Sequence, residues 1–322
     1  MPIQGREVLQ DVEKFFESSE VDTYFMCGLY ILLGVIAIFA NLLNVLFYLY
    51  QPDIRKSHAY IIAVDFGEMI NGLSYILTGI GRGAALIQGR YLQPISVNDC
   101  FFTTYWPAFL IIGPETTALL TILVSFERIV AVNLPHKYDT LFHEERKYLW
   151  FIVVAMVQMG FLTMAAFSAY RDQTLFSDRH CAIISSTSDF FSTFHFAFLV
   201  LSYVVSFVSL FIVYNFQNNK VVSIVDTRTS RAPKIYVFLL MTGVDVIVVS
   251  FPSILMLGTN YKYWYPNDVV VGLATSTFGL LSIIHIIFNM IYDAKFRQRF
   301  VSCYHKVRHN STTSKPTTSS IT

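Results

Sequence analysis

Seven apolar segments, each long enough to cross a lipid bilayer, constrain this chain more than any other feature of its sequence. A helix needs roughly 20 mostly apolar residues to span the hydrocarbon core. The second segment is weakened by Asp65, Glu68 and Asn71, and the seventh by its Gly, Ser and Thr content, so a count of six is the alternative. We predict an all-α membrane protein with seven transmembrane helices, at residues 24–50, 58–80, 101–126, 148–169, 191–216, 234–259 and 268–292.

The composition independently indicates a membrane protein. Of the 322 residues, 54% are hydrophobic and 14% are charged, and the mean hydropathy is +0.51. Ordinary soluble domains are less apolar and carry more charge. The net charge of +1 gives no reason to expect a nucleic-acid partner. The His residues have no metal-ligand spacing, and the sequence has no glycine-rich phosphate loop and no G-x-S-x-G elbow. We therefore expect neither enzyme activity nor a catalytic cofactor.

The distribution of Lys and Arg predicts the orientation. Positive residues favour the cytoplasmic side of a membrane protein. With the N-terminus outside, about two thirds of the 23 Lys and Arg residues fall in inner segments. The first 23 residues show no cleavable signal peptide, so the first span is expected to act as the targeting signal. We expect an extracellular N-terminus at 1–23, the helical bundle at 24–292, an amphipathic membrane-surface helix at 293–305 and a disordered cytoplasmic tail at 306–322.

An acid-base pair, Glu127 and Arg128, lies where the third apolar segment meets a charged loop. At such a boundary the two side chains can form an ion pair, and each can change to a new partner when the helix moves. The alternative is that Arg128 is a simple anchor that extends its side chain to the membrane surface.

The residues that follow this pair favour the first interpretation. The run E-R-I-V-A-V-N-L-P-H-K-Y resembles the D/E-R-Y-x-A-V-x-x-P-L-x-Y signature at the inner end of the third helix of rhodopsin-like G-protein-coupled receptors. Ile129 replaces the usual Tyr, and His136 replaces the usual Leu. The agreements are Glu127, Arg128, Ala131, Val132, Pro135 and Tyr138.

The resemblance implies a receptor mechanism. An extracellular ligand, a small molecule or a peptide, would bind between the helices, and the receptor would then activate a heterotrimeric G protein. Glu127 would hold Arg128 at rest and release it on activation. The docking surface would be completed by Pro135, Tyr138, Arg231 and Lys234. Pro252, which matches the proline of the sixth helix, would kink that helix and act as its pivot.

Polar residues inside the spans are costly in hydrocarbon, so each is a candidate functional residue. Glu68 resembles the acid that holds a sodium ion in the family, Asn41 resembles the conserved polar residue of the first helix, and Asp65 is a rival for the role of Glu68. Asp245 could approach Glu68, His285 or Asn289, or could be an isolated protonated acid. The usual N-P-x-x-Y motif is replaced either by His285 and Asn289 or by Asn289 and Tyr292.

Glu115, in the outer half of the third span, faces either a ligand pocket or a neighbouring helix, and we favour the pocket. The spacing of 28 residues from Cys100 to Arg128 is about one turn longer than the family leads us to expect, and a bulge at Trp106-Pro107 would absorb the excess. The fourth span lacks the family's central Trp, and the fifth lacks its Pro.

Four cysteines are present. In the predicted orientation Cys100 and Cys181 both lie outside, where two thiols are more often bridged than free. The resemblance implies the same disulfide. Cys27 is expected to be a small buried apolar residue. Cys303, beside basic residues on the cytoplasmic side, is a candidate for palmitoylation, with an unmodified thiol as the alternative.

The end of the chain fits the same class of protein. Phe296 and Phe300 would share one face of a short helix that lies on the inner leaflet and contacts membrane lipid. The Ser- and Thr-rich tail from Ser311 would be a substrate for a receptor kinase and would recruit arrestin.

The texture of several segments narrows the resemblance. The stretch from Met69 to Arg82, the second outer loop after Cys181 and the altered seventh-helix motif look like nematode serpentine chemoreceptors, class sx first and class x second. Such a receptor would reside in the plasma membrane, including that of sensory cilia. One alternative is a ligand-gated cation channel like the insect odorant receptors, which have the opposite topology. The other is a membrane scaffold without signalling.

Overall fold

Seven long helices make up most of the chain. The computed structural model describes residues 19–50, 59–223, 232–292, 297–298 and 302. Within these residues, seven helices are long and apolar enough to cross a membrane, as the sequence predicts. They are α1 (Glu20–Leu49), α3 (Ala59–Ile87), α5 (Trp106–Asn133), α7 (Glu144–Ala169), α9 (Asp189–Ser223), α10 (Ala232–Asn260) and α11 (Asp268–Tyr292).

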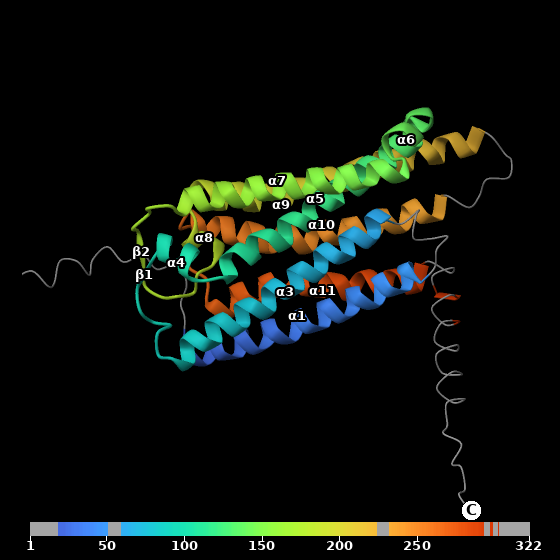
Figure 1. Cartoon of the computed structure of the whole chain (residues 1–322). Helices are drawn as coiled ribbons and strands as arrows, with labels where there is room; N and C mark the ends of the chain where they lie inside the picture. Colours follow the sequence, from blue (N-terminus) through green and yellow to red (C-terminus); the bar gives the residue numbers. More distant parts are fainter. Residues whose placement is uncertain (1–18, 51–58, 224–231, 293–296, 299–301, 303–322) are drawn as a thin grey trace, which may run out of the picture.

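The helices form one elongated bundle with different short elements at its two ends (Figure 1). One end carries α4 (Val97–Thr103), α8 (Ile183–Ser186) and a two-stranded antiparallel sheet of β1 (Ile95–Ser96) and β2 (Leu175–Phe176). The opposite end carries α6 (Pro135–Leu141). In the bundle, α1 packs on α3 and α11, α5 packs on α3 and α9, and α10 packs on α9 and α11.

The third span differs from its predicted bounds. The sequence predicts one helix over 101–126, whereas the chain forms α4, is extended at Thr104, and begins α5 at Trp106. Pro107 lies in the first turn of α5, where its missing N–H costs nothing, but it could not donate to the Thr103 carbonyl in a continuous helix. The extra turn between Cys100 and Arg128 is therefore absorbed by a separate helix and not by a bulge.

Several helices extend beyond their predicted ends. α1 begins at Glu20, where the Ser19 hydroxyl caps the helix by accepting from the Asp22 N–H at 3.2 Å. α3 continues to Ile87, whereas the predicted span ends at residue 80. The hydropathy pattern predicts which residues lie in the hydrocarbon core, and it does not predict where the helix ends. A helix can continue into the polar interface with its backbone hydrogen bonds intact. Of the predicted surface helix at 293–305, only residues 297, 298 and 302 are described, and the tail at 306–322 lies outside the described residues.

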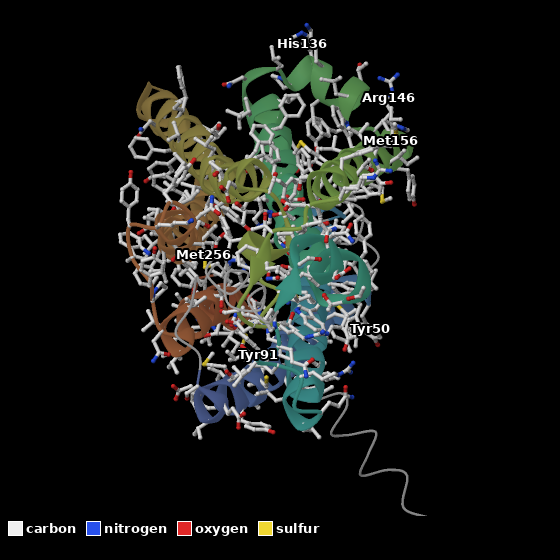
Figure 2. The ribbon with its side chains drawn as sticks, turned by 90° about the vertical axis from the view of Figure 1, so that its left-hand side faces the viewer. Tyr50, Tyr91, His136, Arg146, Met156 and Met256 are labelled. Atoms are coloured by element: carbon white, nitrogen blue, oxygen red, sulfur yellow. A yellow bond between two sulfur atoms is a disulfide. The ribbon has the colours of Figure 1, made fainter. Side chains whose placement is uncertain are left out.

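Apolar side chains cover both the interior and the outer surface of the bundle. Figure 2 looks onto the end that carries the sheet, with Met156 of α7 at the periphery and Met256 of α10 inside. Met156 is 69% exposed and Met256 is 3% exposed. Only 11% of the apolar window of α7 is buried. Exposed apolar surface of this kind is solvated by lipid tails in a membrane.

Two glycines set the closest approach between α1 and α3. A Cβ on Gly34 would lie 2.5 Å from the carbonyl oxygen of Gly72, and a Cβ on Gly72 would lie 3.0 Å from the carbonyl oxygen of Gly34. Small residues at such a crossing let two helix backbones pack directly on each other. The contact partner is backbone, so it cannot move aside as a flexible side chain could.

We predict that Gly34→Ala lowers the melting temperature of the purified receptor in detergent, because overpacking of this kind costs about 1–3 kcal/mol. Gly28→Ala, also on α1, is the matched control, since nothing lies within 4 Å of its Cβ. Alanine favours a helix over glycine by about 1 kcal/mol, so the control should be neutral or stabilising. Equal effects of the two substitutions would contradict the close crossing.

Candidate functional site

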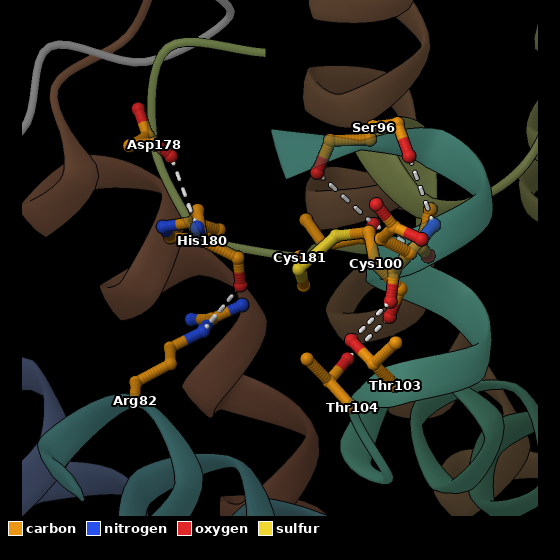
Figure 3. The surroundings of a disulfide bond; sticks show 12 residues. Arg82, Ser96, Cys100, Thr103, Thr104, Asp178, His180 and Cys181 are labelled. Atoms are coloured by element: carbon orange, nitrogen blue, oxygen red, sulfur yellow. Dashed lines mark hydrogen bonds between the residues drawn. A yellow bond between two sulfur atoms is a disulfide. The ribbon is translucent and has the colours of Figure 1, made fainter. Parts of the chain in front are cut away.

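A disulfide anchors the loop between α7 and α9 to the end of the bundle. Cys100 on α4 is bonded to Cys181, with the Cα atoms 5.5 Å apart, which confirms the predicted pair (Figure 3). Both residues are fully buried. The helix α4 is itself fixed by the Ser96 hydroxyl, which accepts from the Asp99 N–H at 3.1 Å. The loop is therefore held over the end of the bundle.

Arg82 of α3 supports the same loop from below. Its Nε donates to the carbonyl oxygen of His180 at 2.8 Å, and the His180 N–H donates to the Asp178 carboxylate at 3.0 Å (Figure 3). The His180 ring lies 3.1 Å from the Tyr91 hydroxyl. The stretch next to the disulfide thus has both its backbone and its side chain fixed.

A cavity of about 70 Å³ lies beneath this loop. Its walls come from α1, α3, α5, the loop with α8, α9, α10 and α11, so it occupies the centre of the bundle at this end. Most lining side chains are apolar, including Phe196, Leu199 and Met256. The polar lining residues include Arg82, His180, His195, Tyr30, Tyr75, Thr78 and Thr275.

Glu115 does not line this cavity. It is fully buried, and its carboxylate accepts from the Gln158 amide of α7 at 3.1 Å and lies 2.8 Å from Nδ1 of His195 on α9. The sequence favours a pocket-facing carboxylate at this position, whereas the structure turns Glu115 toward neighbouring helices. A buried carboxylate needs donors, and α7 and α9 supply them. Glu115 reaches the cavity only through His195.

A second group of polar residues lies nearer the opposite end. Asp245 of α10 is 2.8 Å from Nε2 of His285 on α11, which is one of the three partners that the sequence suggested. The Asn44 amide donates to Asp65 at 2.7 Å, which joins α1 to α3. These four residues line a second cavity of about 70 Å³.

The remaining predicted members of the network are less connected. Glu68 is 3% exposed and lies near enough to His285, Asp245 and Asp65 to interact electrostatically, but it does not line the second cavity. The Asn41 amide donates to the Ala37 carbonyl of its own helix at 3.0 Å. Asn289 and Tyr292 lie in α11, and their side chains are outside the described part of the structure.

The sodium ion that the resemblance implies at Glu68 stays a prediction. Among the described residues, no group of three or more His, Cys, Asp or Glu side chains could hold a metal ion. Two acids line the second cavity, and both have partners: Asp245 is paired with the His285 imidazole, and Asp65 accepts from the Asn44 amide.

The predicted pair at the end of α5 is present. Nε of Arg128 lies 3.8 Å from Oε2 of Glu127, and the Tyr138 hydroxyl donates to Oε1 of Glu127 at 2.8 Å. The Glu127 side chain is 4% exposed and that of Arg128 is 29% exposed. Pro135 begins α6, and this short helix brings Tyr138 back to Glu127. Arg231 lies outside the described residues, as does the side chain of Lys234.

Sequence reasoning missed Arg82 and His195 as cavity residues. Arg82 lies beyond residue 80, the predicted end of the second span, so the prediction places it outside the bundle. A helical extension of one turn past residue 80 would have brought it into the bundle, and that extension carries no hydropathy signal. His195 lies in no motif that would identify it from the sequence.

Seven helices that can span a membrane, a loop tethered by a disulfide at one end and an acid-arginine pair at the opposite end define the class as a seven-helix G-protein-coupled receptor. The family described as serpentine type 7TM GPCR chemoreceptor Srsx matches residues 34–230. The match covers more than half of the chain, so the protein belongs to this family of chemosensory receptors. No curated protein matches the chain. Nothing supports the channel alternative.

We predict that Glu115→Leu destabilises the receptor by about 3–5 kcal/mol, because it leaves the buried Gln158 and His195 without their shared acceptor. The melting temperature in detergent measures this effect. Glu115→Gln, which keeps the shape and one acceptor oxygen, should be less harmful. A leucine variant as stable as the wild type would contradict the role of this contact.

Proposed function

We propose that a small extracellular ligand binds in the cavity beneath the disulfide loop, and that the signal is transmitted to a G protein at the end that carries α6. The observation that carries this proposal is the double restraint on Glu127, which is held by Arg128 of its own helix and by Tyr138 of α6. Because Glu127 is fixed in place, it can in turn restrain Arg128, as a receptor in its resting state requires.

The proposed orientation has the N-terminus outside and the C-terminus in the cytoplasm. Disulfides persist in oxidising compartments, which favours an external position for the Cys100–Cys181 end. The excess of Lys and Arg in the opposite segments favours the same orientation. The chain is a multi-pass membrane protein, and we propose the plasma membrane, including that of sensory cilia, as its location.

A mechanical connection between the two ends runs along α10. Met256 lines the outer cavity, Pro252 lies one turn further in, and Asp245 lies two turns beyond Pro252. Pro252 removes one backbone hydrogen bond and loosens the helix there. A ligand that displaces Met256 would bend α10 at Pro252 and strain the Asp245–His285 contact to α11. In the resting state this contact holds the inner half of α10 against the bundle.

Activation then exchanges partners at the inner end. As the inner half of α10 moves, Arg128 leaves Glu127 and contacts the G protein, with Pro135, Tyr138, Arg231 and Lys234 around it. The free-energy cost of this change of partner is small, because Arg128 is already partly exposed. The proposed partners of the tail are a receptor kinase and arrestin, and Cys303 is a proposed palmitoylation site on the lipid surface.

Removing the Tyr138 hydroxyl tests the restraint. We predict that Tyr138→Phe raises basal nucleotide exchange a few-fold, because a hydrogen bond to a charged group contributes about 1.5–3 kcal/mol when it is lost. Basal exchange is measured as guanine-nucleotide binding by a heterotrimer added to receptor-containing membranes. Tyr148→Phe, on the exposed surface of α7, is the control and should change nothing. Unchanged basal exchange in Tyr138→Phe would contradict the restraint.

A further inference from the structure

We propose that the ligand of the outer cavity is a small organic anion, with an apolar body and one acidic group that pairs with Arg82. This inference rests on the proposed function, since it takes the cavity as the ligand site. It adds the chemical class of the ligand and the residue that selects it.

Arg82 is a buried cation that has no counter-ion among the residues that the structure describes. Its side chain is 4% exposed, yet no carboxylate of the described residues forms an ion pair with it. A guanidinium has five N–H donors and stays charged. Only Nε has a hydrogen-bond partner in the described structure, the carbonyl of His180 at 2.8 Å, and the ring centroid of Tyr30 lies 5.7 Å from the guanidinium carbon.

Asp178, which precedes His180 by two residues in the loop, is already engaged. The carboxylate of Asp178 accepts from the His180 N–H at 3.0 Å and from the Ser177 hydroxyl at 3.1 Å. A charge at this depth is expensive unless an opposite charge joins it. Since the described residues provide none at Arg82 and Arg82 lines the cavity, we assign the missing partner to a molecule inside the cavity.

His195 gives a second, independent indication of a ligand. Its Nδ1 lies 2.8 Å from Glu115, and because a carboxylate accepts, Nδ1 carries the proton of that bond. Its Nε2 is buried and has no hydrogen-bond partner among the described residues. His195 lines the same cavity from α9, whereas Arg82 lines it from α3. The cavity therefore offers two polar groups from different walls.

The size and the remaining walls define the rest of the ligand. A volume of about 70 Å³ is several times what one water molecule needs, so the cavity fits a molecule of a few heavy atoms. Leu199, Phe196 and Met256 form apolar walls. Met256 is unbranched and can adopt other rotamers to admit a longer chain. A short-chain carboxylate provides an acidic group for Arg82 and an apolar chain for these walls. An amine would instead bring a like charge to Arg82.

The surface above the cavity favours the arrival of anions. A crevice at the same end is lined by Arg90 and Arg179 together with Asp99, so its formal charge is positive. Nε of Arg179 is buried and has no hydrogen-bond partner. Charges of one sign around a crevice raise the local concentration of the opposite ion.

Ligand binding can be tested without a G protein. The full chain is purified in detergent and its melting temperature is measured with straight-chain carboxylates of four to eight carbons, and with the amides and amines of the same lengths. A ligand that binds only the folded state raises the melting temperature. We expect at least one acid to raise it by about 2 °C or more, while its amide and amine do not. An amine or amide that stabilises as much as the acid, or a panel without any stabilising acid, would overturn the proposal.

Arg82 variants assign the effect to this residue. We expect Arg82→Gln to abolish the shift and Arg82→Lys to keep a smaller one, with Arg146→Gln, on the opposite end of the bundle, as the control. A shift that survives in Arg82→Gln overturns the assignment. If Arg82→Gln does not fold, the comparison of acid with amide in the wild type and in Arg82→Lys decides. An acid that binds through Arg82 but does not promote nucleotide exchange would separate this inference from the proposed function, which alone would then fail.

Discussion

Buried polar side chains must find their partners within the protein, because the hydrocarbon around the bundle offers none. The described structure meets this constraint with a small number of contacts between helices. Glu115 joins α5 to α7 and α9, Asp65 joins α3 to α1, and Asp245 joins α10 to α11. Apolar packing alone gives little direction to helix association in lipid, since lipid tails are as apolar as the side chains. These polar contacts therefore specify which helices are neighbours.

The same constraint identifies the places where the bundle can change. A polar residue whose hydrogen bonds are all made within the protein stabilises the resting arrangement. A polar residue with donors or acceptors left over can bind a ligand. Arg82 and His195 belong to the second kind, at the disulfide end. Asp245 and Glu127 belong to the first, nearer the α6 end. A ligand at Arg82 and His195 can affect Asp245 through α10, because the proline of this helix lies between Met256 and Asp245.

The sequence predicts much of the fold because apolar length and charge placement are set by the bilayer. The seven spans and the disulfide between Cys100 and Cys181 agree with the prediction. The contact of Asp245 with His285 is one of three that the sequence left open. The direction of single side chains is harder to predict. Glu115 turns away from the cavity because α7 and α9 carry its donors, and no feature of its own helix reveals them. Arg82 enters the bundle because α3 continues past the predicted span. Tyr138 was assigned to the docking surface, but its bond to Glu127 depends on the turn from α5 into α6.

The central claim is that Glu127 restrains Arg128 in the resting receptor. The most direct test is the rate of guanine-nucleotide exchange on a heterotrimeric G protein, in membranes that contain equal amounts of wild-type receptor, Glu127→Gln and the double variant Glu127→Gln/Arg128→Ala. The account predicts several-fold faster exchange without ligand for Glu127→Gln, because the amide no longer holds the cation. It also predicts a return to the background rate in the double variant. Exchange by Glu127→Gln at the wild-type rate, or fast exchange that persists without Arg128, would contradict it.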